Sequence, residues 1–329
     1  MGVGGMQVKI GFGAGRCGNR GGVRSAGTTS PKLEELLQEL DRLVGLWPVK
    51  ELVKEIRAYV EIQRRRQEEG LFSSPMALHM IFKGNPGTGK STVARLLGRI
   101  FKEMGILSQG HLVEVERADL VGEYIGHTAH KTREQMRKAL GGILFIDEAY
   151  SLARGGERDF GREAIDVLVK GMEDYRDNLI LILAGYKEEM EYFLETNPGL
   201  RSRFPIHLEF PDYSVPELMD IAELMFQERQ YYLTVEARLE LERILRREAI
   251  FGHRYNGNAR LVRNIVERAM RKQALRLLEK ARFTREELMT IIKEDLVGAA
   301  SNYRELDRLE GLERSPLKER FQICYNNAS

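Results

Sequence analysis

The stretch Gly84-Asn85-Pro86-Gly87-Thr88-Gly89-Lys90-Ser91 lies between an apolar run at 78–82 and a helical pattern at 92–97. Its glycines allow a tight turn in which successive backbone N–H groups face one phosphate, and a helix beginning at Lys90 adds the positive end of its dipole. This spacing between a strand and a helix is typical of a phosphate-binding loop. We expect Lys90 to neutralise the β- and γ-phosphates of ATP and Ser91 to bind Mg²⁺. The predicted nucleotide-binding residues here are Asn85, Pro86, Gly87, Thr88, Gly89, Lys90, Ser91 and Thr92.

Strand and helix patterns alternate on the carboxyl side of this loop. Apolar runs at 112–115, 142–146, 179–184 and 206–210 predict strands, and helical patterns at about 90–104, 131–140 and 162–173 separate them. Such connections are typical of a parallel sheet with helices on both faces. The predicted fold class is therefore an α/β P-loop NTPase core, with the phosphate loop at the carboxyl ends of the strands.

The flanking regions differ in composition from this core. Two helices are expected before it, one opening at Pro31 and one at Pro48. After Pro211 no further strand is expected, and capping boxes at 214–217 and 284–287 predict an all-helical lid. The predicted organisation is a disordered Gly/Arg-rich head at 1–30, the α/β domain at 31–212, the helical domain at 213–296 and a polar tail at 297–329.

Composition narrows the class of protein. The 329 residues are 43% hydrophobic and 30% charged with a formal net charge of +2, so no strong basic excess points to nucleic acid. No apolar run approaches the roughly 20 residues that cross a bilayer. Cys17 and Cys324 lie near opposite ends, which argues against a disulfide framework and favours a cytoplasmic location. A GxGxxG match at 13–18 lacks a flanking strand and helix and is set aside.

Two carboxylates follow the apolar run at 143–146. Adjacent residues of a strand point to opposite sides, so Asp147 and Glu148 are expected to have separate roles. We expect Asp147 to hold Mg²⁺ beside Ser91, and Glu148 to act as the general base for the attacking water.

Together these motifs resemble the AAA+ ATPases, and within them the branch of stage V sporulation protein K and the red-type Rubisco activases. The likeness covers about 33–296 and is closer to the sporulation protein than to the activases. It is carried by 82–90, by Asp119-Leu120-Val121-Gly122-Glu123-Tyr124-Ile125-Gly126-His127-Thr128, by 141–152 and by Asn197-Pro198-Gly199-Leu200-Arg201-Ser202-Arg203-Phe204.

The resemblance implies a pore and a shared active site. Tyr124-Ile125-Gly126 matches the aromatic-aliphatic-glycine loop that lines the central pore, and an aromatic ring there grips a peptide through contact area. Arg203 matches the arginine finger that reaches the γ-phosphate of a neighbouring subunit, with Arg201 as the competing position.

The resemblance also completes the nucleotide site. Arg260 matches the arginine of the helical domain that touches the nucleotide of its own subunit, with Arg263 one turn later as the alternative. Val44 and Gly45 are placed near the adenine. One departure is Tyr186, which stands where many AAA+ proteins carry a polar Asn or Thr to position the lytic water; its role stays open.

The sequence therefore predicts a Mg²⁺-dependent ATPase that forms a ring, expected to be a homo-hexamer, and pulls on an unidentified protein client, with sporulation as the implied setting. Three alternatives remain at this point. One is a nucleotide-gated nucleic-acid protein of the clamp-loader or initiator type, against which the near-neutral charge argues. The second is a Rubisco activase, and the third is an assembly scaffold with slow hydrolysis.

Overall fold

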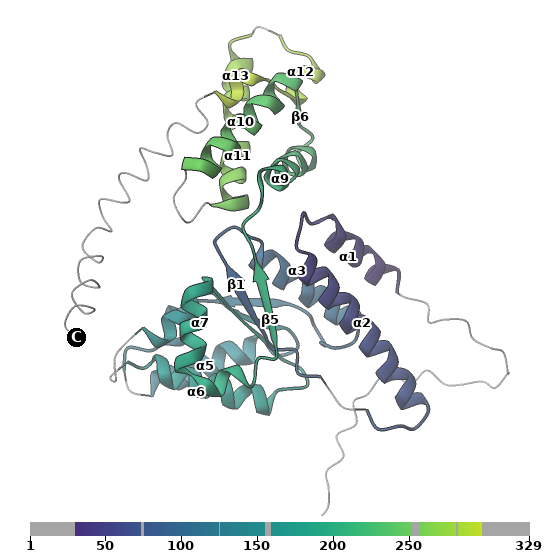
Figure 1. The fold of residues 1–329 in the computed structure, drawn as a ribbon, viewed down its shortest axis with the longest axis vertical. Coiled ribbons are helices and arrows are strands. Elements are labelled where there is room, and N and C mark those ends of the chain that lie inside the picture. The colour runs from purple at the N-terminus through teal and green to yellow at the C-terminus, as the bar shows by residue number, and fades with distance from the viewer. Residues whose placement is uncertain are drawn as a thin grey trace, which may run out of the picture.

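The computed structural model describes residues 30–73, 76–124, 126–154, 159–251, 257–280 and 282–297. Figure 1 shows an α/β unit below and a helical unit above, joined where strand β5 runs up into helix α9. The predictions for the Gly/Arg-rich head, the GxGxxG match, both cysteines and nearly all of the polar tail fall outside the described residues.

Five parallel strands form the sheet that carries the phosphate loop. They are β1 (Met80–Gly84), β2 (Leu112–Val115), β3 (Ile143–Ile146), β4 (Ile180–Gly185) and β5 (Ile206–Phe210), in the order β2-β3-β4-β1-β5. Every neighbouring pair is parallel. Their carboxyl ends therefore share one edge, which confirms the predicted sheet.

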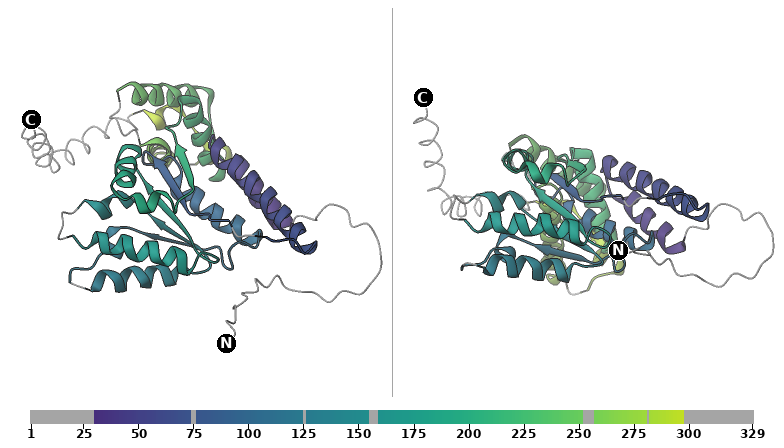
Figure 2. Two further views of the ribbon diagram at one scale, coloured as in Figure 1. Left: turned by 60° about the horizontal axis from the view of Figure 1, so that its bottom comes forward. Right: turned by 90° about the horizontal axis from the view of Figure 1, so that it is seen from below.

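Helices cover both faces of the sheet, as the side views of Figure 2 show. In β1, Met80 and Phe82 pack with α1–α3, whereas Ile81 packs with the helices on the opposite face, so the uniformly apolar strand is buried on both sides. One face carries α1 (Pro31–Arg42), α2 (Trp47–Glu68) and α3 (Lys90–Glu103). The other elements of this unit are α4 (Arg117–Leu120), α5 (His127–Lys138), the 3₁₀ turn η1 (Ala149–Ala153), α6 (Gly161–Asp174), α7 (Lys187–Thr196) and α8 (Pro198–Arg201).

The helical unit has its own apolar core and one feature that the sequence analysis missed. It contains α9 (Val215–Glu228), α10 (Val235–Phe251), α11 (Asn258–Leu278), α12 (Arg285–Met289) and α13 (Lys293–Leu296). Both predicted capping boxes are present, at the start of α9 and of α12. The expectation of a purely helical lid was wrong in one detail, because β6 (Tyr232–Leu233) pairs in parallel with β7 (Thr290–Ile291). Strands of two residues are too short to produce an alternating pattern.

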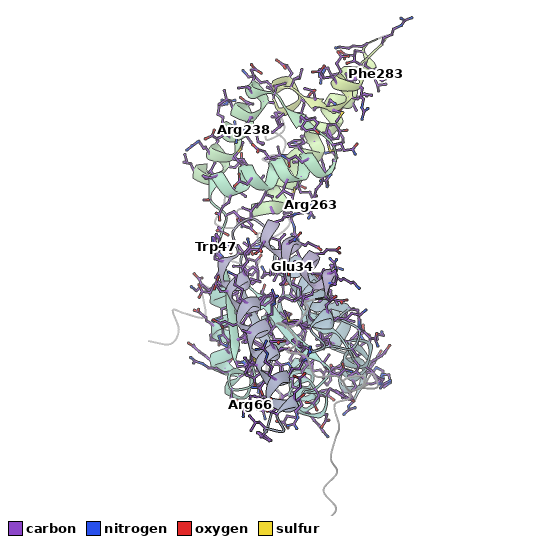
Figure 3. The ribbon with its side chains drawn as sticks, turned by 90° about the vertical axis from the view of Figure 1, so that its right-hand side faces the viewer. Glu34, Trp47, Arg66, Arg238, Arg263 and Phe283 are labelled. Carbon is purple, nitrogen blue, oxygen red and sulfur yellow. The ribbon has the colours of Figure 1, made fainter. Side chains whose placement is uncertain are left out.

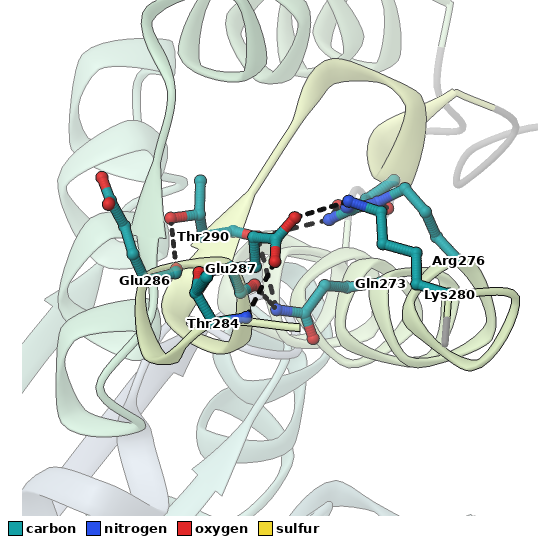
Figure 4. Close-up of polar contacts among 8 residues, drawn as sticks. Gln273, Arg276, Lys280, Thr284, Glu286, Glu287 and Thr290 are labelled. Carbon is teal, nitrogen blue, oxygen red and sulfur yellow. Dashed lines mark hydrogen bonds and ion pairs between the residues drawn. The ribbon is translucent and has the colours of Figure 1, made fainter. Parts of the chain in front are cut away.

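Polar contacts tie the end of the helical unit together (Figure 4). Gln273 of α11 donates through Nε2 to the carbonyl oxygens of Glu287 at 3.1 Å and Leu288 at 2.9 Å. Arg276 forms a bidentate pair with the buried Asp295, with both N···O distances at 2.9 Å. These contacts hold α12, β7 and α13 on the C-terminal part of α11.

His79, buried at the start of β1, predicts a pH-dependent stability. Burial lowers the pKa of its imidazole to about 4, and Nδ1 accepts a hydrogen bond from the Leu181 N–H at 3.1 Å. Between pH 6.5 and 4 the unfolded chain binds this proton and the folded chain does not, so stability falls with falling pH, by about 3 kcal/mol in all.

Urea unfolding of the wild type and of His79→Gln across this pH range measures the effect. The slope of unfolding free energy against pH should be smaller in His79→Gln, and unchanged in His130→Gln, whose side chain is exposed. Equal slopes in all three proteins would contradict the assignment.

Candidate functional site

The phosphate loop connects β1 to α3 at the carboxyl edge of the sheet. Gly87 and Gly89 have φ values of 76° and 96°, which residues with a Cβ rarely adopt. Thr88 Oγ1 donates to the Asn85 carbonyl at 2.8 Å, and Lys90 Nζ donates to the carbonyls of Gly84 and Asn85 at 2.8 Å each. An ammonium has three donors, so one N–H of Lys90 remains available for a phosphate oxygen.

Charged groups from separate elements act on Lys90. Burial lowers the pKa of its ammonium; the carboxylates of Asp147 and Asp212 act against that shift, and the positive charge of Arg260 adds to it. Two predicted nucleotide-binding residues, Asp147 and Arg260, are thus near Lys90 although they follow it by many residues. The half-buried ammonium of Lys90 therefore lies among charges of both signs, two carboxylates and one guanidinium.

Asp147 and Glu148 lie just beyond β3, not on it, because the strand ends at Ile146. Glu148 is in the left-handed region with φ 46°, and its N–H donates to Asp147 Oδ1 at 3.0 Å. The expectation that strand alternation separates the two carboxylates was therefore wrong. The left-handed turn at Glu148 does so instead, at a cost of about 1–3 kcal/mol, and such strain is typical of functional sites.

The residues present fit a magnesium ion that is held together with nucleotide. Ser91 offers a hydroxyl oxygen, and among the described hydrogen bonds Asp147 accepts only through Oδ1, which leaves Oδ2 for a metal. No cluster of three or more His, Cys, Asp or Glu side chains in the described ranges could hold a metal by itself. This donor set suits Mg²⁺, which keeps several waters and takes one or two protein ligands plus phosphate oxygens.

Val44 and Gly45, which were predicted to lie near the adenine, belong to the segment between α1 and α2. This segment lies beside the phosphate loop. Gly45 has φ 65°, and a Cβ at this position would lie 2.8 Å from Glu217 Oε1 of α9, so the segment also contacts the helical unit. A groove of about 170 Å³ opens here between α1 and α3, lined by Glu39, Leu43, Ser91, Thr92, Arg95, Leu96 and Arg99. Its lining thus includes Ser91, predicted to bind Mg²⁺, and Leu43, the residue before Val44.

The first turn of α11 contacts the phosphate loop directly. Ala259 N–H donates to the Gly87 carbonyl at 3.1 Å, and a Cβ on Gly87 would lie 2.3 Å from the Gly257 carbonyl oxygen. This contact places Arg260 at the loop. Arg263 is exposed on the next turn, and Figure 3 shows it on the side of the helical unit that faces the α/β unit.

Sequence reasoning missed a polar network that joins the two units. The Asp212 carboxylate accepts from Asn85 Nδ2 at 3.0 and 2.9 Å and from Asn258 Nδ2 at 2.8 Å. Tyr213 donates its hydroxyl to the Thr88 carbonyl at 3.1 Å. The side chain of Asn85, predicted to bind nucleotide, is thus bound to the segment that links β5 to α9. No local motif marks Asp212, so only a tertiary structure could reveal it.

Tyr124 lies between α4 and α5 and is exposed. Its side chain has a relative exposure of 66%, and its ring meets that of His127 edge-on at 5.4 Å between centroids. Gly126 has φ 82°, with nothing within 4 Å of a Cβ built there. The exposure excludes an ordinary buried tyrosine. Ile125, the middle residue of the predicted pore loop, lies outside the described residues.

Arg203 is not part of the site in its own chain. It lies three residues before the start of β5, at the amino edge of the sheet, whereas the phosphate loop follows β1 at the carboxyl edge. Its guanidinium donates to Glu173 Oε1 at 2.7 Å and to the Gly199 carbonyl at 2.9 Å. Arg201, the competing position, is exposed. A role for Arg203 in catalysis therefore requires a second copy of the chain.

Tyr186 lies between β4 and α7, at the same edge of the sheet as the end of β3. Its ring packs against that of Tyr150 with 6.1 Å between centroids, and Gly185 permits this approach, because a Cβ there would lie 2.7 Å from the Tyr150 ring. Burial, together with the Glu148 charge, raises the pKa of Tyr150, so its phenol stays neutral. Tyr186 is thus an aromatic neighbour of the Glu148 turn, and its catalytic role stays open.

Two family models match consecutive parts of the chain. Residues 80–212 match the ATPase family associated with various cellular activities (AAA), and residues 214–305 match the AAA lid domain. Together they cover the sheet from β1 onward and the helical unit.

Individual relatives point to one branch of that family. The chain is 56% identical to stage V sporulation protein K of Bacillus subtilis over 80% of this chain and 82% of that protein. It is 47% identical to the chloroplastic ribulose bisphosphate carboxylase/oxygenase activase of Cyanidioschyzon merolae, over 81% of this chain and 92% of that protein. It is 50% identical to protein CbbX of Cereibacter sphaeroides over 74% and 79%.

Among solved structures, the Holliday junction branch migration motor RuvB of Thermotoga maritima matches with a TM-score of 0.51 and 19% identity, covering 80% of this chain and 70% of that one. At this identity the match supports the fold and no shared substrate.

Proposed function

Because the chain belongs to the AAA ATPases, in the branch of stage V sporulation protein K and the Rubisco activases, we propose that it is a Mg²⁺-dependent ATPase that remodels a protein client as a ring. The observation that supports this best is geometric: the phosphate loop after β1, the Asp147 turn after β3 and the first turn of α11 lie at one edge of the sheet. Lys90, Asp147 and Arg260 belong to these three segments, at the edge where we propose that a triphosphate binds.

Each residue of this site has a distinct task in the proposed reaction. The phosphate loop orients the triphosphate, and Lys90 and Arg260 counter its charge. Ser91 and Asp147 would hold Mg²⁺, which supplies charge stabilisation at the β- and γ-phosphate oxygens. Glu148 takes the proton from the attacking water, and Val44 and Gly45 border the adenine.

The ring is proposed because one chain lacks a complete site. Arg203 lies at the sheet edge opposite its own phosphate loop, so it can complete only a neighbour's site. Head-to-tail contacts of this type form a ring when the rotations between successive subunits add up to a full turn. We propose a homo-hexamer by analogy with the family. The exposed Tyr124, with Ile125 and Gly126, would contact the client in the pore.

The names of the relatives suggest two settings. Sporulation is the first proposal, since the 56% identity to the sporulation protein exceeds that to the activase of Cyanidioschyzon merolae. Activation of Rubisco is the alternative. We propose a cytoplasmic location with the first setting. None of the described helices is long and apolar enough to cross a membrane. A nucleic-acid partner is disfavoured by the formal net charge of +2.

ATP hydrolysis per subunit, measured against protein concentration, tests the proposal. We expect a rate that depends on Mg²⁺ and rises with concentration until rings are complete, because a lone subunit lacks the arginine in trans. A rate per subunit that is independent of concentration would contradict shared sites and favour the slow scaffold. Salt-sensitive stimulation by DNA would instead revive the clamp-loader or initiator function.

A further inference from the structure

Arg117, the first residue of α4, connects this helix to η1 and to the start of α6. Its Nη1 donates to the Ser151 carbonyl at 2.6 Å, and its Nη2 pairs with Asp159 Oδ1 at 2.5 Å. The side chains of Arg117 and Asp159 have relative exposures of 33% and 11%. A planar guanidinium can bond two acceptors at fixed positions, which an ammonium cannot do in the same way.

One of these contacts leads back to the general base. Ser151 lies in η1, which begins at the residue after Glu148, and Ser151 N–H donates to the Glu148 carbonyl at 2.8 Å. Arg117 therefore bonds the turn whose left-handed first residue is Glu148. A change in the backbone at Glu148 must move the carbonyl that Arg117 holds.

The second contact leads to α6. Asp159 Oδ1 also accepts from the Gly161 N–H at 3.1 Å, at the start of that helix. A Cβ on Gly161 would lie 2.0 Å from the Leu152 carbonyl oxygen and 2.9 Å from Arg117 Nη1. The three elements are packed too closely to move independently. The Asp159-Phe160-Gly161 sequence, which no nucleotide contact explains, thus supplies both the acceptor for Arg117 and the glycine that makes room for it.

The backbone of Arg117 connects α4 to the segment that carries Tyr124. The Val121 N–H donates to the Arg117 carbonyl at 2.9 Å, which closes α4 at the base of the Tyr124 loop, defined here as residues 121–124 and Gly126. Two fully buried threonines of α5 fix that base. Thr132 donates to the Leu120 carbonyl at 3.1 Å, and Thr128 accepts from the Gly122 N–H at 3.0 Å. Helix α4 and the loop base therefore move as one block.

We propose that Arg117 is a positioning residue that transmits the state of the nucleotide site to the Tyr124 loop. This inference rests on the proposed function, since it gives the Tyr124 loop a response to ATP. The route runs from Glu148 through η1 to Arg117, and from α4 to the loop. Asp159 holds the guanidinium in the orientation that reaches Ser151.

Amide hydrogen exchange of the full chain in the Glu148→Gln background, with and without MgATP, tests the route. With Arg117 present, ATP should slow exchange in the phosphate loop at 84–92 and also change exchange at 117–128. In Arg117→Gln the protection at 84–92 should remain, and most of the ATP-induced change at 117–128 should be lost. Arg117→Lys should keep part of this change at 117–128, because lysine keeps the positive charge but lacks the planar guanidinium that bonds two acceptors.

Controls separate this route from general damage. Arg137→Gln removes an exposed arginine of α5 and should leave both responses unchanged. If Arg117→Gln does not fold, Asp159→Asn tests the same pair with a side chain of the same shape. The proposal is overturned if ATP changes amide exchange at 117–128 equally with and without the Arg117 side chain. It is also overturned if ATP changes no exchange at 117–128 in the Glu148→Gln protein that keeps Arg117. Absence of protection at 84–92 in the parent would instead count against the nucleotide site itself.

Discussion

Glu148→Gln is expected to lower ATP turnover by about 10²- to 10⁴-fold, the range that general acid–base catalysis contributes. The amide has the shape of the carboxylate but cannot accept a proton from the attacking water. ATP binding should change little, because the triphosphate is proposed to bind to Lys90 and the phosphate loop, whose described hydrogen bonds do not involve Glu148. Single-turnover hydrolysis and equilibrium binding of a fluorescent ATP analogue measure the two effects separately.

The matched control is Glu195→Gln, which neutralises an exposed glutamate of α7. It should retain full turnover. The strained backbone at Glu148 adds a second measurement. Glu148→Gly should be as inactive as Glu148→Gln, but it should unfold at a higher temperature than Glu148→Gln, because glycine adopts φ 46° at little cost. Full turnover in Glu148→Gln would remove the general-base assignment.

The parts of this fold that sequence could predict are those with local causes. The phosphate loop is visible because glycines, Lys90 and Ser91 follow one another between a strand and a helix. The strands are visible because burial on both faces makes them apolar throughout, as at 143–146. The capping boxes that open α9 and α12 are equally local.

The parts that sequence could not predict depend on distant residues that meet. Asp212 lies 127 residues after its partner Asn85, and its neighbours Pro211 and Tyr213 carry no motif. The φ of Glu148 is similarly hidden, because Glu is a poor residue for the left-handed region and sequence rules favour strand geometry there. The pairing of Arg117 with Asp159 joins residues 42 apart. Each of these features lies close to the proposed chemistry, where local preference gives way to function.

Arg203→Ala is expected to reduce turnover of a uniform ring by about 10³-fold or more, the effect of removing an arginine supplied in trans. In this chain Arg203 is held by Glu173 at 2.7 Å, but the two side chains have relative exposures of 36% and 64%. An exposed pair of this type contributes about 0–1 kcal/mol, so a neighbour's γ-phosphate can recruit the guanidinium at small cost. Arg201→Ala, at the competing position, should retain most of the activity.

Mixing two inactive variants makes this prediction sharper. An Arg203→Ala subunit keeps Glu148, and a Glu148→Gln subunit keeps Arg203, so a complete site forms wherever the first receives the arginine of the second. Random assembly of equal amounts makes about one quarter of the interfaces complete if neighbours contact each other head to tail. Turnover recovered to about that fraction of the wild-type rate would establish that catalysis occurs between subunits. A mixture as inactive as its components would mean either that Arg203 acts within its own chain, against which the opposite edges of the sheet argue, or that one inactive site arrests the ring. Diluting wild type with Glu148→Gln alone distinguishes these, because only an arrested ring loses activity faster than its fraction of wild-type subunits.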